Sequence, residues 1–396
     1  MRLVTHRSIV KAGQVLVSLL VGLLVTEFGL RLAERRGLGD RAMQAEPDAL
    51  LGHRVAAEAY GHDANGFRND TVPAHTDIVA LGDSQTWGVN AIRSTAWPQA
   101  LERRSRRTVY NMGLGGYGPV QYWVLTDKAT QLSPKIIVIG LYFGNDMYDA
   151  YSIAYHNDAY ASLRQSDAAD KLLPDAVEPR AAALWDELQN YHNNYGRSSS
   201  GWSYWLRGHS AIGRLLTRTG LWDGNVDVWY EIGAAWAQAY PDQGAAYKDN
   251  YSRTVLAPAY RLTALDLDEV RIVEGVRLTK DLLRRIKRKT DQEKVKLLVL
   301  YIPTKEMVYA EAVQNSQGQL KGSYAKLTGM EARIATEITS FCDQEGIEHV
   351  DALPQLREAV RQNKQIYPSD TESHPNAQGY SVLASTVNEA LTGRGW

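Results

Sequence analysis

The sequence predicts a doubly wound α/β domain, on the basis of three observations. Short apolar segments rich in β-branched residues, at 77–82, 108–111 and 135–143, are typical of buried strands. Segments with helical spacing, at 95–106 and 119–132, separate these strands. Strands that alternate with helices along a chain form a parallel sheet with helices on both faces, so we expect that architecture here.

The first predicted strand, 77–82, ends in the tripeptide Gly82, Asp83, Ser84. Glycine permits a tight turn, and the Asp83 side chain can bond its own loop backbone. The turn would place the Ser84 hydroxyl at the carboxyl end of a strand, where open α/β sheets carry their chemistry. Ser84 is therefore a candidate nucleophile, and the alternative is an ordinary β-turn with a helix cap.

Two further loops follow predicted strands in the same way. The strand at 108–111 runs into a glycine-dense loop that contains Gly116. The strand at 135–143 is the most apolar in the chain and runs into a loop that contains Asn145. A doubly wound sheet would bring both loops to the edge that carries Ser84.

The second half of the chain resumes the same alternation after a long interruption. A helix at 267–289 precedes a fourth strand at 296–303, and a helix at 330–345 precedes a fifth strand at 347–351. A final helix at 377–391 closes the predicted domain.

The interruption itself, 148–265, is expected to be a helical insertion into the domain, because aliphatic runs are few there and aromatic residues are many. Tryptophan and tyrosine offer flat apolar faces with a polar edge, which suits contact with sugar rings, a partner protein or a membrane surface. The alternative is a satellite core in which these rings only pack against one another. The tryptophans of this segment are Trp185, Trp202, Trp205, Trp222, Trp229 and Trp236.

The amino-terminal segment predicts a membrane anchor within residues 1–36. Residues 12–26 carry no charge, and the apolar character extends over 9–32, after several basic residues. About 20 apolar residues suffice to cross a bilayer, so we expect a single transmembrane helix with the body outside the cytoplasm, on the periplasmic side in a Gram-negative cell. The alternative, a cleaved signal peptide, requires a small-x-small site, and none is clear. Residues 37–76 are expected to be a linker leading to the domain edge.

The composition excludes several classes of function. Lys plus Arg number 44 and Asp plus Glu number 45, so the formal net charge of −1 provides no field that would gather nucleic acid. Cys342 is the only cysteine, which rules out an internal disulfide and a cysteine-based metal site. A chain of 396 residues with 44% hydrophobic content can bury a large core.

A histidine that could serve Ser84 lies in the polar loop before the last predicted helix. His374 could take the proton of Ser84, and either Asp370 or Glu372 could orient its ring, which is the third role in nucleophilic catalysis. The histidines that precede Ser84 lie in unpatterned sequence and are expected to be surface residues: His53, His62 and His75.

Three groups on the predicted loops could stabilise an oxyanion. They are the main-chain N–H groups of Ser84 and Gly116 and the side-chain amide of Asn145. Donors of this kind usually contribute the largest single part of the transition-state stabilisation in acyl transfer. No step of this chemistry requires a metal or another cofactor, and we expect neither.

These motifs together resemble those of the SGNH, or GDSL-type, hydrolase family, in the order of the family's blocks. Residues 82–84 resemble the first block, the loop through Gly116 the second, residues 144–146 the third, and the loop ending at His374 the fifth. The resemblance spans residues 77–391. It implies a flavodoxin-like three-layer α/β/α sandwich and a metal-free esterase or acyltransferase, in which Ser84 is the nucleophile, His374 the base, and Gly116 and Asn145 the oxyanion donors.

The acid of the site departs from the family's pattern. The family usually spaces its acid two or three residues before the histidine, whereas Glu372 lies two and Asp370 four residues before His374. We prefer Asp370 because residues 367–370 resemble the family's usual lead-in, followed by an insertion of two residues. Glu372 remains the alternative acid.

Three functions from different classes are consistent with this sequence. In the first, an anchored serine esterase removes O-acetyl or other acyl groups from an extracytoplasmic polysaccharide. In the second, the same domain is a polysaccharide O-acetyltransferase that works with a membrane acyl-donor protein. In the third, the fold is a glycan-binding or scaffold module without turnover. The presence of Ser84, Asn145 and His374 together favours the first two.

Overall fold

The computed structural model describes residues 6–35, 45–57, 59, 61–165, 172–199, 210–212 and 228–396. The chain divides into two compact units, one formed by 1–43 and 190–228 and the other by 44–189 and 229–396. The second unit contains the predicted sheet and all the candidate site residues.

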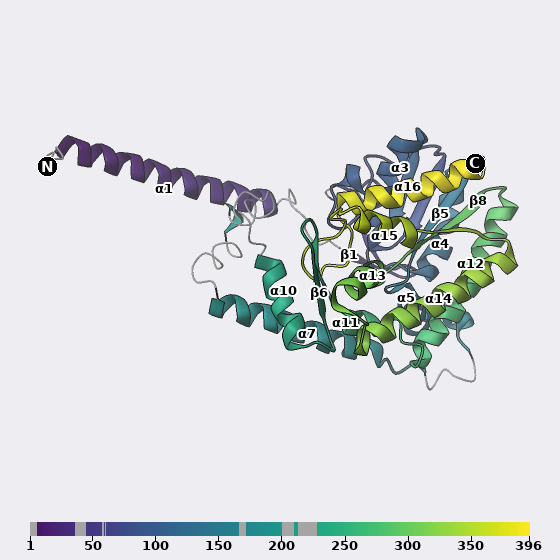
Figure 1. Ribbon diagram of the computed structural model, residues 1–396. Helices are drawn as coiled ribbons and strands as arrows, with labels where there is room; N and C mark the ends of the chain where they lie inside the picture. The colour runs from purple at the N-terminus through teal and green to yellow at the C-terminus, as the bar shows by residue number, and fades with distance from the viewer. Residues whose placement is uncertain are drawn as a thin grey trace. The chain divides into compact units, whose positions relative to one another are not determined.

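A five-stranded parallel sheet forms the centre of the second unit (Figure 1). The strand order is β4-β3-β5-β8-β9, which in chain order is the 2-1-3-4-5 arrangement of flavodoxin-like sheets. This confirms the predicted α/β class and the parallel sheet. The strands are β3 (Ile78–Gly82), β4 (Val109–Gly113), β5 (Ile136–Tyr142), β8 (Lys296–Ile302) and β9 (Glu348–Asp351).

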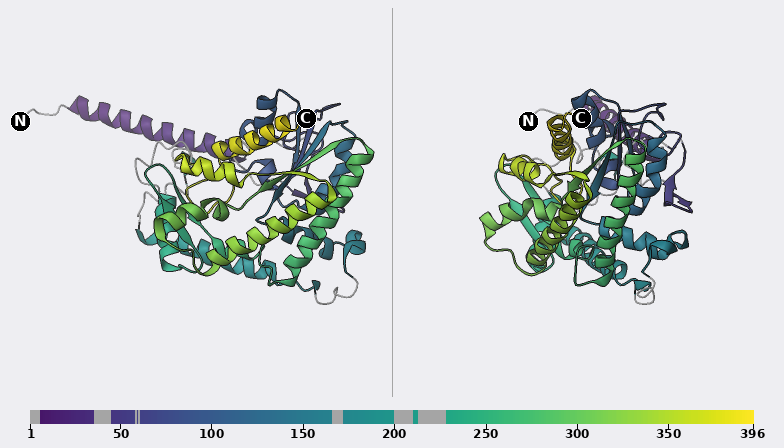
Figure 2. Two further views of the ribbon diagram at one scale, coloured as in Figure 1. Left: turned by 45° about the vertical axis from the view of Figure 1, so that its right-hand side comes forward. Right: turned by 90° about the vertical axis from the view of Figure 1, so that its right-hand side faces the viewer.

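Helices cover both faces of this sheet (Figure 2). All residues of β3, β4 and β5 are buried, as expected for parallel strands between two helical layers. The layer that shares a core with Ile78, Val138 and Leu300 contains α3 (Trp97–Ser105), α13 (Lys305–Gln317), α15 (Leu353–Arg361) and α16 (Ala377–Gly393). The other layer contains α4 (Pro119–Thr130), α5 (Asp146–His156) and α12 (Val270–Gln292).

The helical elements of the second half differ in part from the prediction. The helix predicted at 330–345 is α14 (Gly322–Glu345), which begins earlier. The sequence analysis predicted neither α13 nor α15. Each begins soon after a strand ends, β8 and β9 respectively, and the two helices pack against each other.

The predicted insertion at 148–265 begins inside α5, which packs against α12. Trp236 is buried, as a satellite core requires, whereas Trp185 is 40% exposed. Trp202, Trp205 and Trp222 lie outside the described residues. The described elements of this region are η2 (Asp158–Leu163), α7 (Val177–Ser199), α10 (Val228–Ala239), β6 (Ala245–Lys248), β7 (Arg253–Leu256) and α11 (Pro258–Leu262).

Part of the segment predicted as a linker, 37–76, has regular structure. Strands β1 (Ala45–Asp48) and β2 (Gly52–Val55) pair as an antiparallel hairpin. A turn also lies in this segment, closed by the Gly66 N–H, which donates to the Asp63 carbonyl at 2.9 Å, with Gly66 at a φ of 78°. This hairpin contacts the glycine loop that follows β4, as described below.

The prediction of a membrane-spanning amino-terminal helix is wrong. Helix α1 (His6–Arg35) covers the predicted segment, but no helix among the described residues has both the length and the apolar character that a membrane crossing requires. Glu27 lies within α1, pairs with Arg31 at 2.7 Å and accepts the N–H groups of Ala211 and Ile212. A charged side chain inside a bilayer costs about 2.5 kcal/mol or more, so these groups count against the predicted 9–32 span.

Candidate active site

Ser84 is the first residue of the short helix α2 (Ser84–Trp87), directly after β3. Asp83 caps this helix, because its carboxylate accepts the N–H of Gln85 at 2.9 Å. Asp83 therefore bonds its own loop backbone as the sequence predicted. The Ser84 side chain is left at the carboxyl end of a central strand of the sheet.

Helix α2 lies very close to the strands beneath it, because glycines end or interrupt those strands. A Cβ atom added to Gly82 would lie 2.0 Å from Thr86 Oγ1, and one added to Gly140 would lie 2.5 Å from the same atom. Trp97 Nε1 donates to Thr86 Oγ1 at 3.3 Å, which holds the threonine between these glycines. The glycine of the Gly-Asp-Ser motif thus serves close packing of α2, rather than the turn flexibility that the sequence analysis assigned to it.

The structure brings Ser84 and His374 together, although 290 positions separate them in the sequence. Ser84 Oγ lies 2.8 Å from His374 Nε2, and His374 Nδ1 lies 2.5 Å from Glu372 Oε1. With a proton on Nδ1, the ring donates to the carboxylate and accepts from the serine hydroxyl. This is the arrangement of a nucleophile, a base and an orienting acid.

The carboxylate that contacts the His374 ring is that of Glu372, not that of Asp370, which the sequence analysis preferred. The Asp370 carboxylate instead accepts the main-chain N–H of Glu372 at 3.0 Å. Asp370 thus shapes the turn that carries the acid, while Glu372 contacts the ring. The spacing of two residues between Glu372 and His374 matches the family's usual pattern without any insertion.

Lys305, at the start of α13, is bonded to the loop that carries Asp370 and Glu372. Its side chain is fully buried, and Nζ donates to the carbonyl oxygens of Asp370 at 2.7 Å and Glu372 at 2.9 Å. Burial lowers the pKa of Lys305 to about 8, against the opposing effect of nearby carboxylates that include Glu306. The sequence analysis missed this residue, since nothing in the local pattern marks a lysine as buried.

Electrostatics keep Glu372 ionised. Burial by itself would raise its pKa, but the hydrogen bond and charge of His374, the His374 main-chain N–H and the charge of Lys305 lower it to about 2. An ionised carboxylate at this position favours the tautomer with the proton on Nδ1 and stabilises the imidazolium that forms when His374 takes a proton.

The predicted oxyanion donors lie on loops that flank the end of β3. Gly116 follows β4 and Asn145 follows β5, the two strands on either side of β3. Among the described residues, the N–H groups of Ser84 and Gly116 have no acceptor. Asn145 Nδ2 donates one hydrogen to Asp149 at 2.7 Å, which leaves its second hydrogen available.

Three buried or partly buried carboxyl groups lie around this edge of the sheet: Asp83, Asp146 and Asp149. Burial raises the pKa of Asp83 to about 6, against the lowering effect of the Gln85 N–H and the charge of His374. Burial and the charge of Asp83 also raise the pKa of Asp146 and of Asp149. Asp146 accepts from the Tyr122 hydroxyl and from the Tyr142 N–H at 2.9 Å, so it connects the start of α5 to the end of β5.

Arg68 is a further residue whose role the sequence did not reveal. Its guanidinium donates to the carbonyl oxygens of Gly88 and Ala91, each at 2.8 Å, and lies over the Trp87 ring at 4.0 Å. These contacts hold the end of α2 and the loop beyond it.

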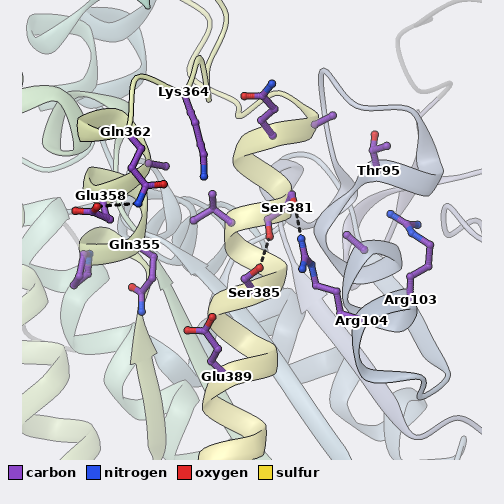
Figure 3. Close-up of a pocket in the computed structure, with 16 residues that line it drawn as sticks. Thr95, Arg103, Arg104, Gln355, Glu358, Gln362, Lys364, Ser381, Ser385 and Glu389 are labelled. Carbon is purple, nitrogen blue, oxygen red and sulfur yellow. Dashed lines mark hydrogen bonds between the residues drawn. The ribbon is translucent and has the colours of Figure 1, made fainter.

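A cavity of the second unit is separate from this site (Figure 3). Its volume is about 1060 Å³, and its walls come from α3, α15 and α16, with Arg103, Arg104 and Lys364 among the lining residues. None of Ser84, Glu372 and His374 lines it. Within the described part of the chain, no cluster of three or more His, Cys, Asp or Glu side chains could hold a metal ion.

No family model matches the sequence, and no characterised protein matches it either. Several solved structures are similar to the chain. A chain described as a candidate lipolytic protein of the G-D-S-L family from Desulfitobacterium hafniense has a TM-score of 0.37 and 11% identity, over 79% of this chain and 98% of that one.

Two further structures come from Bacteroides. A candidate acylhydrolase from Bacteroides fragilis has a TM-score of 0.33 and 11% identity, over 80% of this chain and 86% of that one. A GDSL-like lipase from Bacteroides thetaiotaomicron has a TM-score of 0.32 and 11% identity, over 80% of this chain and 88% of that one.

Proposed function

We propose that the chain is a serine esterase of the SGNH type that acts through an acyl-enzyme. The observation that carries this proposal is the continuous hydrogen-bonded series from Ser84 Oγ to His374 Nε2, at 2.8 Å, and from His374 Nδ1 to Glu372 Oε1, at 2.5 Å. A serine hydroxyl activated in this way attacks the carbonyl carbon of an ester.

In the acylation step, His374 takes the Ser84 proton as the oxygen attacks the ester carbonyl. The resulting imidazolium then gives this proton to the departing alcohol, and Ser84 is left acylated. In the second step His374 takes a proton from water, the hydroxide adds to the acyl carbon, and the carboxylic acid leaves as Ser84 regains its proton. Glu372 holds the ring in one orientation throughout.

The charge that develops on the carbonyl oxygen requires donors that are already in place. The Ser84 N–H, the Gly116 N–H and the second amide hydrogen of Asn145 supply three such donors, and the described residues offer them no other acceptor. Donors that are fixed before the reaction stabilise the transition state without reorganising.

We propose acyl groups on a polysaccharide, such as O-acetyl groups, as the substrate. A series of contacts between aromatic rings and a guanidinium group supports this choice, because it extends from a partly exposed tryptophan to the end of the strand beside the site. The Trp185 and Tyr260 rings lie 5.4 Å apart, and the Arg261 guanidinium lies 5.2 Å from the Tyr260 ring and 6.0 Å from the Tyr142 ring. Such flat faces with polar edges suit sugar rings. The location of that polysaccharide outside the cytoplasm stays a prediction.

The test is the release of acetate from an aryl acetate and from an acetylated polysaccharide, with and without an unacetylated glycan as acceptor. Ser84→Ala protein serves as the control for background hydrolysis. We expect acetate release by the parent protein and none above background by the variant. Acetyl transfer to the glycan in preference to water would assign an O-acetyltransferase, while glycan binding without either reaction by the parent protein would reject the catalytic proposal.

A further inference from the structure

We propose that His53 is a positioning residue for the oxyanion hole. Its ring holds the peptide group between Gly115 and Gly116 in the orientation that points the Gly116 N–H toward the oxyanion. This inference rests on the proposed function, in which that N–H binds the oxyanion. The sequence analysis had expected His53 to be a surface residue.

The contact originates in the hairpin of β1 and β2, which packs against the glycine loop. His53 lies on β2 and is half-buried. Its Nε2 lies 2.8 Å from the carbonyl oxygen of Gly115. Tyr117 fastens the same region, since its hydroxyl donates to the His53 carbonyl at 2.9 Å and the two rings lie 5.3 Å apart. The His53 ring and the backbone that carries it are therefore both bonded to the glycine loop.

The glycine loop is a tight turn whose middle peptide can take two orientations. The N–H of Tyr117 donates to the carbonyl of Leu114 at 3.1 Å, which closes a four-residue turn. Gly116 is its third residue and has a φ of 76°, the value that a type II turn requires there. A type I turn between the same ends differs mainly by a rotation of the middle peptide through roughly 180°.

That middle peptide carries both the Gly115 carbonyl and the Gly116 N–H. Because a trans peptide is planar, these two groups point in opposite directions. Any contact that fixes the carbonyl therefore fixes the direction of the N–H. Glycine at both central positions accepts either turn type, so the turn residues themselves do not decide between them.

His53 supplies the missing constraint. A carbonyl oxygen only accepts, so Nε2 of His53 must carry the proton and donate. This bond is present in the type II orientation, and a flip of the peptide would break it. The ring also occupies the space beside Gly116, since an added Cβ there would lie 3.2 Å from His53 Cε1.

The test compares His53→Leu, which removes the donor, with His53→Gln, whose side-chain amide can place a donor near the position of Nε2. The matched control is His75→Leu, an exposed histidine in the same part of the chain. The kinetic constants kcat and KM are measured with an aryl acetate, and thermal unfolding checks the fold of each variant. Infrared spectroscopy of a slowly hydrolysed acyl-enzyme then reports the strength of hydrogen bonding to the acyl carbonyl.

We expect His53→Leu to lower kcat by about tenfold or more, a part of the hundredfold or greater loss that follows removal of an oxyanion donor. We expect KM to change less than about twofold, because the donor acts in the transition state. The acyl carbonyl stretch should move to higher frequency in this variant. His53→Gln should recover most of kcat, and His75→Leu should match the parent protein.

Several outcomes would overturn the proposal. Parental kcat in His53→Leu would show that the turn keeps its orientation without the ring. A fall in kcat with an unchanged carbonyl frequency, or a fall that His53→Gln does not restore, would show a general structural role. These results differ from a failure of the proposed function, which would appear as a parent protein without Ser84-dependent hydrolysis and would remove the basis of this inference as well.

Discussion

One oxygen atom of Glu372 accepts two hydrogen bonds from His374. Its Oε1 lies 2.5 Å from the ring Nδ1 and 3.1 Å from the main-chain nitrogen. The two bonds fix both the ring and the backbone that carries it, so the imidazole is held toward Ser84. Among the described residues, the hydrogen-bond partners of this ring are Glu372 and Ser84, and the Asp370 carboxylate bonds the Glu372 N–H instead.

We therefore expect Glu372→Gln to lower kcat by about a hundredfold or more, since an amide no longer favours the active tautomer or stabilises the imidazolium. Asp370→Asn is the matched control. Its side-chain oxygen can still accept the Glu372 N–H, so we expect a loss of less than about tenfold. Steady-state kinetics of both variants with an aryl acetate provide the measurement, and the opposite ranking would return the acid role to Asp370.

Ser84→Ala should lower kcat by several powers of ten and leave the melting temperature unchanged, because a partly buried hydroxyl adds little to packing but is the whole nucleophile. Ser385→Ala, on α16, is the matched control and should retain full activity. Labelling with a fluorophosphonate, followed by peptide mass analysis, should locate the label at Ser84. Residual activity above about a tenth of the parental value in Ser84→Ala would contradict the assignment.

Asn145→Ala should lower kcat by about a hundredfold, with a much smaller change in KM, if its amide donates to the oxyanion. Asp149→Ala should produce a smaller loss of the same kind, because Asp149 accepts one amide hydrogen of Asn145 at 2.7 Å and thereby orients the other. Asn388→Ala, on α16, is the control. A rise in KM without a fall in kcat would make Asn145 a substrate-binding residue.

Glu331 makes the stability of the fold depend on pH. It is buried and accepts the Thr304 N–H at 2.9 Å. Burial raises its pKa to about 7 from 4.5, against the bonds from Thr304 and together with the charge of Glu306. The folded state thus binds this proton more tightly than the unfolded state, so the contribution of Glu331 to stability is fully present below pH 4.5 and is lost as the pH rises through 7.

Glu331→Gln removes this titration. Relative to the parent protein, the variant should gain stability between pH 5 and pH 8, by about 3 kcal/mol at most for a shift of this size. Urea unfolding at the two pH values measures the difference. Glu337→Gln, at an exposed position of the same helix, is the control. An equal stability difference between parent and Glu331→Gln at both pH values would show that Glu331 does not titrate as described.

The sequence alone was sufficient to predict the central strands of the sheet and two residues of the candidate site, Ser84 and His374. The apolar runs at 77–82, 108–111 and 135–143 predicted β3, β4 and β5 to within two residues, because strands buried on both faces must be apolar throughout. Helices α13 and α15 escaped prediction, as did the hairpin of β1 and β2. The residues of α13 are buried on several sides, so its spacing shows little, whereas the buried Leu356, Ala359 and Val360 of α15 do have helical spacing and were overlooked.

By itself the sequence determined the order of strands and helices, the placement of Ser84 after a central strand and the pairing of Ser84 with His374. The first two follow from periodicity and from the rule that parallel strands end at one edge, and the third from the chemistry of a histidine base and the resemblance to the family's motifs. Only the tertiary structure decided between Asp370 and Glu372, which lie two positions apart in one loop. The choice depends on how that loop folds over Lys305, which lies 65 positions before Asp370 in the sequence. Buried contacts between residues so far apart in sequence produce no local sequence pattern.

The same reason explains the other differences. His53 contacts the Gly115 carbonyl from a hairpin 62 positions earlier. The close approach of α2 to the sheet depends on Gly140, which lies on β5 and not on β3, the strand that leads to Ser84. For α1, hydropathy alone predicted a membrane span, whereas the folded chain surrounds Glu27 with the polar groups of 210–212. A one-dimensional pattern records which residues are apolar, but the partners of a buried polar group are determined only when the chain has folded.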